Sequence, residues 1–309
     1  MTHLTVAWVN TYLIKRCFVT EAYMKPLNES TLIVCSIVRN AERGLRKNIP
    51  VVKEWCRHFK NFRVVAYEND STDGTKELLK AWRQDSPERI HVLLNDTDAS
   101  RTIPDPHEVK GNPFFSYRRI SKMAYLRNQY LDYVERKGWE ADYLMVVDLD
   151  VAQLYVQPVL DALSTDREWD VLTAFGYSRS PSFKRRYHDG YALTRTGEEL
   201  VPQTERMIYS MPELFGRLRP SDDWVRVYSA FGGLSLYKYE VIKGLRYEVL
   251  PNDDPRVEVH CEHFSLCQQI HERGCHNIYV VPAMVLKYQA VTPRLIWSTL
   301  KRRFVKRIC

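Results

Sequence analysis

The sequence has no run of the roughly 20 mainly apolar residues that a transmembrane helix needs, although it is 309 residues long. The mildly apolar start, residues 4–14, lacks both a basic beginning and a small-residue cleavage site, so we do not expect a signal peptide. Neither absence says what the protein does. Together they favour a cytoplasmic location, with contact to the inner face of a membrane as a peripheral alternative.

Cysteine occurs without the pattern of a disulfide framework. The seven cysteines are an odd number with scattered spacing, which favours a reducing compartment. There is no compact C-x-x-C pair. His263, Cys267 and His271 recur every four residues and would share a helix face, which leaves a zinc site as an alternative. We favour the simpler interpretation that the cysteine is a small buried apolar residue.

Acidic residues are absent after Glu272, whereas eight of the 45 basic residues lie beyond that point. The rest of the chain is therefore almost neutral, and its composition does not favour nucleic-acid binding. Residues 291–309 are predicted to form a basic amphipathic helix, since apolar residues recur four apart from Ile296 to Ile308. Such a helix can lie on an anionic membrane surface, or it can pack its apolar side against the rest of the chain.

A predicted strand that ends in two carboxylates organises the sequence. Residues 143–147 are uncharged and rich in apolar side chains, which is typical of a buried strand in a parallel sheet. Because side chains alternate along a strand, Asp148 and Asp150 are expected on one face and Leu149 on the other. Ligands bind beyond the carboxyl ends of such strands, and two hard oxygen ligands there suit Mg²⁺ or Mn²⁺. A solvated acidic turn is the competing interpretation.

Strands and helices alternate around this motif. The sequence predicts strands over residues 31–38, 62–67, 90–94, 143–147, 169–175 and 277–286, and helices up to about 58 and over 76–82, 121–137 and 154–163. Pro50 is a local objection to the first helix. Alternation with short connections indicates an α/β fold with a doubly wound, mostly parallel sheet flanked by helices. We expect one large domain, residues 1–290, followed by the basic tail.

Three motifs carry a resemblance to a known family. The loop E-N-D-S-T-D-G-T at residues 68–75 is similar to the D-D-G-S-T-D-G-T loop of the glycosyltransferases that include cellulose and chitin synthases. Leu126-Arg127-Asn128 resembles their A-R-N segment and, as there, comes shortly before the D-x-D strand. Residues 31–150 thus resemble the nucleotide-binding half of a GT-A glycosyltransferase. In this sequence Glu68 and Asn69 stand in place of the usual paired aspartates, and Asp70 in place of a glycine.

The resemblance implies a site for a nucleotide sugar in this half. Asp148 and Asp150 would hold Mn²⁺ or Mg²⁺ against the two phosphates of a UDP- or GDP-sugar. The residues expected to contact the nucleotide are Asn40, Glu68, Asn69, Asp70 and Arg127. Arg127 would bind a phosphate or the D-x-D carboxylates; the competing interpretation is an exposed helix arginine.

Residues 151–290 are expected to form the acceptor half. The segment around Asp189 resembles a Y-x-D-x-x-A-L segment of capsule-type mannosyltransferases and their bacterial or viral relatives. Glu262 resembles, in position, an acidic motif that provides the general base of an inverting transfer, and His263 is a further candidate metal ligand. Asp222 and Asp223, beside Trp224, complete the candidate catalytic carboxylates. Asp189 also fits a surface turn, and Asp222 and Asp223 also fit a helix cap or exposed turn.

Gly232 and Gly233, between two strand-like segments, indicate a close approach of the backbone to another segment or a ligand. The whole pattern implies a metal-dependent glycosyltransferase that moves a hexosyl or pentosyl unit to a carbohydrate, glycan or lipid-linked hydroxyl. Two alternatives stay open. A haloacid-dehalogenase-like phosphohydrolase also places D-x-D after an apolar strand, but normally at its first core strand. A non-catalytic sugar-binding GT-A relative would keep the fold alone.

Overall fold

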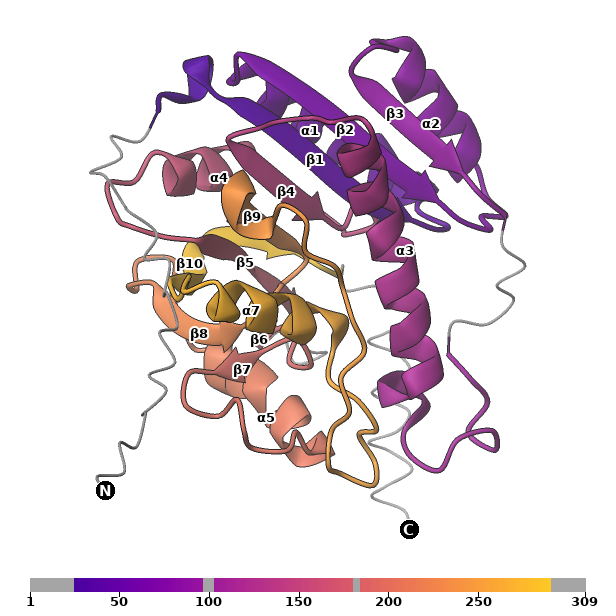
Figure 1. The fold of residues 1–309 in the computed structure, drawn as a ribbon, viewed down its shortest axis with the longest axis vertical. Coiled ribbons are helices and arrows are strands. Elements are labelled where there is room, and N and C mark those ends of the chain that lie inside the picture. The colour runs from indigo at the N-terminus through magenta and orange to yellow at the C-terminus, as the bar shows by residue number, and fades with distance from the viewer. Residues whose placement is uncertain (1–24, 97–102, 180–183, 290–309) are drawn as a thin grey trace, which may run out of the picture.

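The computed structural model of the chain describes residues 25–96, 103–179 and 184–289. Ten strands form one sheet in the order β3-β2-β1-β4-β9-β5-β10-β8-β7, with β6 beside β5 (Figure 1). The strands are β1 (Thr31–Val38), β2 (Asn61–Glu68), β3 (Ile90–Leu94), β4 (Tyr143–Val147), β5 (Val171–Arg179), β6 (Arg185–Tyr187), β7 (Thr194–Arg195), β8 (Val225–Ser229), β9 (Leu234–Lys238) and β10 (Ile278–Lys287). The predicted tail, residues 291–309, lies outside the described residues, so its contact with a membrane stays a prediction.

The first half of the sheet is parallel. Strand β1 pairs in parallel with β2 on one side and β4 on the other, and β3 extends the sheet in parallel beyond β2. Strand β9 enters antiparallel between β4 and β5, and β10 is parallel to β5. The carboxyl ends of β1, β2 and β4 therefore meet at one edge. The prediction of an α/β fold with a mostly parallel sheet is confirmed.

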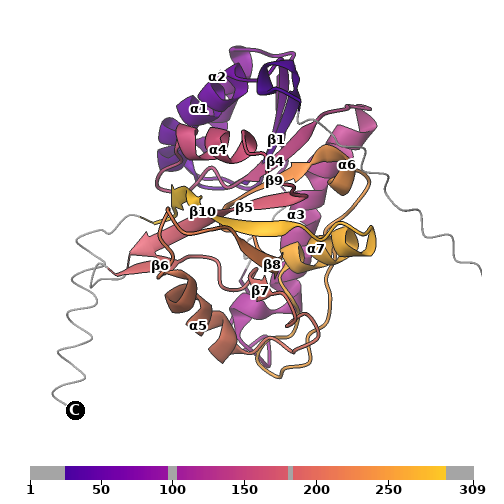
Figure 2. The same ribbon diagram turned by 90° about the vertical axis from the view of Figure 1, so that its left-hand side faces the viewer.

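Helices cover both faces of this sheet. They are α1 (Glu42–Arg57), α2 (Thr75–Gln84), α3 (Tyr117–Arg136), α4 (Val156–Leu163), α5 (Glu205–Phe215), α6 (Tyr239–Ile242) and α7 (Glu262–Glu272). Figure 2 shows α1, α2 and α4 on one face and α3, α6 and α7 on the other. Strand β4 alternates between the two cores, since Met145 and Val147 pack on the α1 side and Leu144 and Val146 on the α3 side. This alternation decides where the D-x-D side chains point.

One helix begins earlier than predicted, and another has its predicted extent despite an internal proline. Helix α3 begins at Tyr117 rather than at residue 121, because the hydroxyl of Ser116 accepts a hydrogen bond from Arg119 N at 3.3 Å and caps the helix. Helix α1 continues through Pro50, which removes one backbone hydrogen bond without ending the helix.

The predicted close approach at the paired glycines is confirmed. Strands β8 and β9 do not pair with each other, and the link between them passes over β5. A Cβ atom on Gly232 would lie 2.1 Å from the carbonyl oxygen of Ala174, and one on Gly176 would lie 2.0 Å from the carbonyl oxygen of Gly232. Gly232 also has a φ of 65°. Only glycine fits this crossing without moving the backbone.

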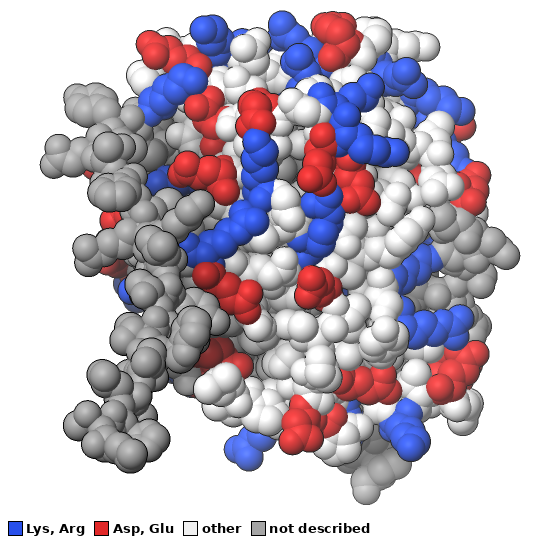
Figure 3. Space-filling view, viewed as in Figure 1, with Lys and Arg blue, Asp and Glu red and all other residues white. Residues whose placement is uncertain are grey.

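The charge distribution on the surface and the state of the cysteines give little information about function. On the face drawn in Figure 3, basic and acidic side chains are interspersed and form no stripe of one sign. Within the described ranges, Cys35, Cys56, Cys261 and Cys267 are free thiols, and we find no helix long and apolar enough to cross a membrane.

Candidate active site

A cavity of about 380 Å³ opens at the edge where the parallel strands end. Strand-end residues, segments of η2 (Pro113–Phe115) and α3, the loop after β6 and the start of α7 all contribute to it. Its polar lining comprises Arg39, Asn69, Arg119, Arg127, Asp148, Asp150, His188, Asp189, Cys261, Glu262, His263 and Tyr288. The chain thus brings residues from both halves of the sequence to one concave site, which is where ligands of open α/β sheets bind.

Asp148 and Asp150 both line this cavity, whereas Leu149 is 1% exposed and packs in the core on the α1 side. The side chain of Asp148 is 13% exposed, and Asp150 is exposed. Although β4 ends at Val147, the two carboxylates keep to the cavity side, and Asp148 lies beside Arg127 of α3. The arrangement is the one expected from the sequence.

The backbone of the D-x-D loop is fixed by Asn48 of α1, which is fully buried. Its Nδ2 donates to the carbonyl oxygens of Leu149 at 3.0 Å and Val151 at 2.8 Å, and its Oδ1 accepts from Leu154 N at 3.0 Å. On the other side, Asp148 N donates to the carbonyl oxygen of Gly233 at 2.9 Å. Every polar atom of the Asn48 amide group therefore serves this loop.

Tyr288, directly after β10, orients the first carboxylate. Its hydroxyl donates to Asp148 Oδ2 at 2.9 Å. The ring of His188 stacks on the Tyr288 ring, with 3.4 Å between centroids, and His188 Nδ1 lies 2.9 Å from Ser178 Oγ. Burial lowers the pKa of His188 to about 4, so this ring is neutral at pH 7 and adds no charge beside the carboxylates.

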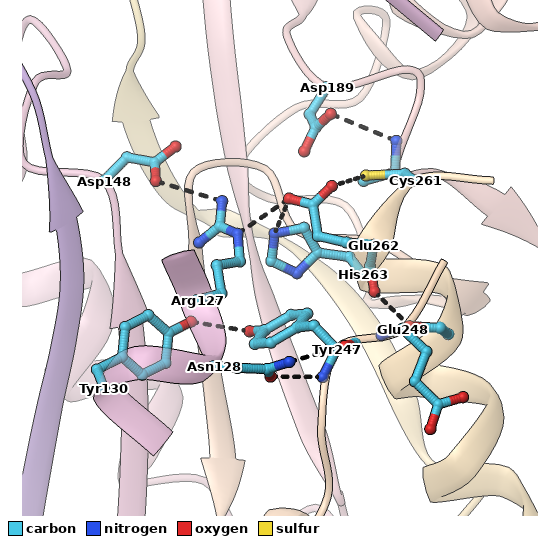
Figure 4. Close-up of polar contacts among 12 residues, drawn as sticks. Arg127, Asn128, Tyr130, Asp148, Asp189, Tyr247, Glu248, Cys261, Glu262 and His263 are labelled. Atoms are coloured by element: carbon cyan, nitrogen blue, oxygen red, sulfur yellow. Dashed lines mark hydrogen bonds and ion pairs between the residues drawn. The ribbon is translucent and has the colours of Figure 1, made fainter. Parts of the chain in front are cut away.

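Arg127 joins the two halves of the site. Figure 4 shows its guanidinium between Asp148 and Glu262. Its Nε donates to Glu262 Oε1 at 2.9 Å, and its Nη2 lies 3.8 Å from Asp148 Oδ1. The side chain is 4% exposed, yet its Nη1 has no hydrogen-bond partner within the part of the chain that the structure describes. Arg127 is therefore no surface arginine, and its guanidinium lies in the cavity lining between a carboxylate of each half.

The carboxylates of the cavity have different proton affinities. Burial raises the pKa of Asp148 to about 7, with Arg127 opposing the rise and Asp150 adding to it. Burial also raises the pKa of Asp189, to about 6. Burial acts in the same sense on Glu262, but there the charges of Arg127, His263 and Arg119 together outweigh it and the pKa falls to about 2. Glu262 is thus the weakest base of the three.

His263 does not face Asp148 directly, because Figure 4 shows Arg127 between them. Its ring stacks on Phe231 at a centroid distance of 3.9 Å. Neither ring nitrogen has a hydrogen-bond partner among the described residues. Those residues also contain no group of three or more His, Cys, Asp or Glu side chains arranged to hold a metal ion.

The two loops expected to contact the nucleotide are tied to each other. Asn40 Oδ1 accepts from Thr72 N at 2.8 Å, and Asn40 N donates to Ser71 Oγ at 2.9 Å. Within the second loop, Glu68 Oε1 accepts from Ser71 N at 2.8 Å. Asn40 and Asp70 have φ angles of 47° and 53°, in the left-handed region. Of the four candidates in these loops, Asn69 lines the cavity and the others do not.

Asp222 and Asp223 are not brought to the cavity. They lie in an exposed turn before β8. Asp222 Oδ2 accepts from Arg219 N at 2.8 Å, and Asp223 forms an ion pair with Arg167 at 2.9 Å. This is the turn that the sequence left as the alternative to a catalytic role. By contrast, Asp189 reaches the cavity and accepts from Gly232 N at 3.3 Å.

The sequence analysis did not predict several residues of the site, including Arg39, Asn48, Arg119, His188 and Tyr288. Tyr288 carried a usable signal, because it directly follows the last strand and strand ends line such sites. Asn48 lies mid-helix and carried no signal.

Comparisons with known proteins identify one matching family and several solved structures with low sequence identity to this chain. A sequence profile described as cryptococcal mannosyltransferase 1 matches residues 31–272, well over half of the chain. No curated protein matches the sequence. Among solved structures, the mannosyltransferase PcManGT from Pyrobaculum calidifontis, in complex with GDP-Man and Mn²⁺, is 15% identical with a TM-score of 0.46, covering 91% of this chain and 63% of that one. S. aureus TarS 1–349 is 14% identical with a TM-score of 0.46, covering 88% and 64%.

The chain spans less than two thirds of the length of these two structures. At such identities and TM-scores they say nothing about the ligands or reaction of this chain. The family match is of a different kind, because it extends over both halves of the sheet and the cavity between them. It confirms the resemblance to GT-A and capsule-type mannosyltransferases, and the chain belongs to the cryptococcal mannosyltransferase 1 family.

Proposed function

We propose that this protein is a metal-dependent glycosyltransferase that moves a sugar from a UDP- or GDP-sugar to a hydroxyl of a glycan or glycoconjugate. Its family favours a mannosyl unit. The observation that carries the proposal is the meeting of Asp148, Asp150 and the buried Arg127 in one cavity at the carboxyl edge of the sheet. Oxygen ligands beside a buried cation suit a diphosphate with its metal ion.

Asp148 and Asp150 fit a hard divalent cation. Two carboxylates leave the remaining positions of an Mn²⁺ or Mg²⁺ ion to water and to donor phosphates, which is how such ions are usually bound in proteins. When bound, the cation supplies positive charge against the diphosphate as it leaves. Tyr288 keeps Asp148 Oδ2 in place, and Asn48 keeps the loop in place.

Arg127 would contact the donor phosphates. The carboxylate of Glu262 fixes the guanidinium through Nε, and Nη2 lies toward Asp148 at 3.8 Å from Oδ1. A charge fixed before the substrate arrives needs no reorganisation as negative charge develops on the leaving group. Asn69 and Arg39, which line the cavity after β2 and β1, are placed for the nucleoside. Asn40, Glu68 and Asp70 would act by shaping the loop.

Asp189 is the better candidate for the general base of an inverting transfer. A base works best when its pKa is close to the working pH. The pKa of Asp189 is raised to about 6 by burial, so the carboxylate is ionised at pH 7 and still takes up a proton readily. Glu262, the base expected from the sequence, has a pKa of about 2 and is held by Arg127. We assign Glu262 to positioning Arg127.

Calorimetric titration of UDP and GDP, each with and without Mn²⁺, tests the donor site. Wild type should bind one of them only with the metal, and Asp150→Ala should abolish that binding. Asp161→Ala, an exposed aspartate of α4 outside the cavity, is the matched control and should bind as wild type does. Absence of binding for both nucleotides, or equal binding without metal, would overturn the proposal. No observation favours the phosphohydrolase alternative.

A further inference from the structure

An exposed aromatic ring and an arginine lie together in the cavity wall formed by η2 and the start of α3. Phe114 is 52% exposed although it lines the cavity. Arg119 lines it as well, and its Nη1 donates to the carbonyl oxygen of Phe114 at 2.9 Å. We call Phe114 and Arg119 the shelf. A ring exposed in a cavity wall offers a flat apolar surface to a ligand.

The shelf is held firmly by its surroundings. Asn112 N donates to the carbonyl oxygen of Arg256 at 3.0 Å, and Asn112 Nδ2 donates to the hydroxyl of Tyr209 at 3.2 Å. Tyr117 N donates to Glu258 Oε2 at 2.8 Å. Side chains and backbone of α5 and of the segment before α7 thus fix both ends of the turn. Phe114 is exposed on a rigid support, which lowers the entropy cost of binding a ligand there.

Arg119 forms no ion pair within 4.0 Å with a described acidic side chain, although its charge helps from a greater distance to lower the pKa of Glu262. Arg118 pairs with Glu108 at 2.8 Å and lies outside the cavity lining. Arg127 pairs with Glu262. The guanidinium of Arg119 is therefore oriented by a neutral carbonyl oxygen and keeps its charge available to the cavity. A guanidinium binds carboxylate and phosphate groups through paired hydrogen bonds.

The shelf lies on the acceptor side of the site. Arg119 precedes Arg127 by two turns of α3, which places it roughly 12 Å along the helix from the phosphate-binding arginine. The ring of Phe115, next to Phe114, packs on Tyr191 at a centroid distance of 4.6 Å, and Tyr191 belongs to the loop that carries Asp189. The shelf is thus placed to hold a sugar unit of the acceptor that does not itself react.

We propose that the acceptor is an anionic glycan, with the apolar face of one sugar ring on Phe114 and its carboxylate or phosphate group on Arg119. This inference rests on the proposed function, since it takes the donor to lie beside Asp148 and Arg127. An acidic acceptor would form with Arg119 the direct ion pair that no described side chain provides within 4.0 Å, and a neutral acceptor would not.

The test compares acidic oligosaccharides with neutral counterparts of the same backbone. One pair is a uronic-acid-containing oligosaccharide and its carboxyl-reduced form; the other is a phosphorylated mannose oligosaccharide and its dephosphorylated form. Binding is measured by calorimetry on the protein loaded with nucleotide and Mn²⁺. Wild type should prefer one acidic member about ten-fold, the factor that one charge-assisted contact commonly provides. The pair that shows the preference identifies the anion as carboxylate or phosphate.

Two pairs of variants make the result specific. Arg119→Gln should remove the preference, whereas Arg118→Gln, one residue away and outside the cavity, should keep it. Phe114→Ala should weaken binding of both members of a pair, whereas Tyr117→Ala, also exposed but outside the lining, should not. Equal binding of acidic and neutral members by wild type, or a preference that survives Arg119→Gln, would overturn the inference. Nucleotide binding by Arg119→Gln should match wild type, so failure of the shelf is distinguishable from failure of the donor site.

Discussion

Tyr288 donates a hydrogen bond of 2.9 Å to Asp148, so the last described strand fixes the first carboxylate of the D-x-D motif. The bond occupies Oδ2 and leaves Oδ1 toward Arg127, at 3.8 Å from its Nη2. The stacked His188 ring keeps the phenol from rotating away. Residues 140 positions apart in the sequence thus set the orientation of one proposed metal ligand.

Tyr288→Phe should lower the affinity for Mn²⁺, measured by calorimetry in the presence of the bound nucleotide. Loss of a hydrogen bond to a metal ligand typically weakens metal binding by about 10–100-fold. The ring and its stacking on His188 remain, so the melting temperature should change little. Tyr279→Phe, on the same strand and outside the cavity, is the control. Unchanged Mn²⁺ affinity in Tyr288→Phe would show that the hydroxyl does not orient Asp148.

Glu262→Ala should lower the free energy of unfolding by about 3–5 kcal/mol, because it leaves the buried Arg127 without its carboxylate. Glu262→Gln keeps an oxygen near Arg127 Nε and should lower the free energy of unfolding by less than Glu262→Ala does. Urea unfolding of both single variants and of the double variant Arg127→Met/Glu262→Leu measures how much the unpaired Arg127 guanidinium lowers the free energy of unfolding. A double variant as unstable as Glu262→Ala would contradict this explanation.

The stability that Glu262 contributes should depend on pH in a defined direction. Its folded-state pKa of about 2 lies below the ordinary value of 4.5, so the contribution is complete above about pH 4.5 and is lost as the pH falls toward 2. Unfolding of wild type and Glu262→Gln should therefore differ most near neutral pH, and the difference should shrink in this acid range. A constant difference would mean that the charge is not what stabilises the pair.

Asp189→Asn should reduce kcat by about 10²–10⁴-fold, the usual contribution of a general base, and leave metal-dependent nucleotide binding unchanged. In wild type, kcat/KM should rise with pH through about 6 as the carboxyl of Asp189 ionises, and then level off. If Glu262→Gln abolishes turnover without weakening nucleotide binding, and Asp189→Asn retains activity, Glu262 is the base instead.

Gly232→Ala should destabilise the protein far more than Gly138→Ala. Both glycines have positive φ angles, 65° and 61°, but a Cβ atom on Gly232 would meet the carbonyl oxygen of Ala174 at 2.1 Å and one on Gly138 would meet nothing within 4 Å. The Gly138 variant carries only the backbone strain, roughly 1–2 kcal/mol. Thermal unfolding compares the two. An equal loss of stability in the two variants would mean that the segment between β8 and β9 moves away from β5 readily.

Local pattern was enough to predict most of the sheet. Alternation in β4 gave the direction of Asp148 and Asp150, and the paired glycines gave the close approach near β5. These features depend on neighbours in the sequence, where side-chain period and backbone space follow from residue type. The start of α3 was placed too late because Ser116 acts as its cap, a signal that was present and not used.

The roles of individual carboxylates could not be predicted in the same way. Glu262 was expected to be a base, but its chemistry depends on Arg127, which is 135 residues away in the sequence. Asp222 and Asp223 had the same composition cues as Asp189, and only the folded chain separates the exposed turn from the cavity. Proton affinity depends on burial and charged neighbours, and neither can be read from a short motif.

The three hydrogen bonds of Asn48 to the D-x-D loop have a consequence for the proposed binding of a metal ion. Because a helix side chain holds the D-x-D loop through three hydrogen bonds, the entropy of ordering this loop is lost when the chain folds and not when the ion arrives. Metal uptake should then be fast and should leave amide hydrogen exchange in the loop almost unchanged. The loop would then have the same conformation with and without the metal ion, whatever the metal concentration.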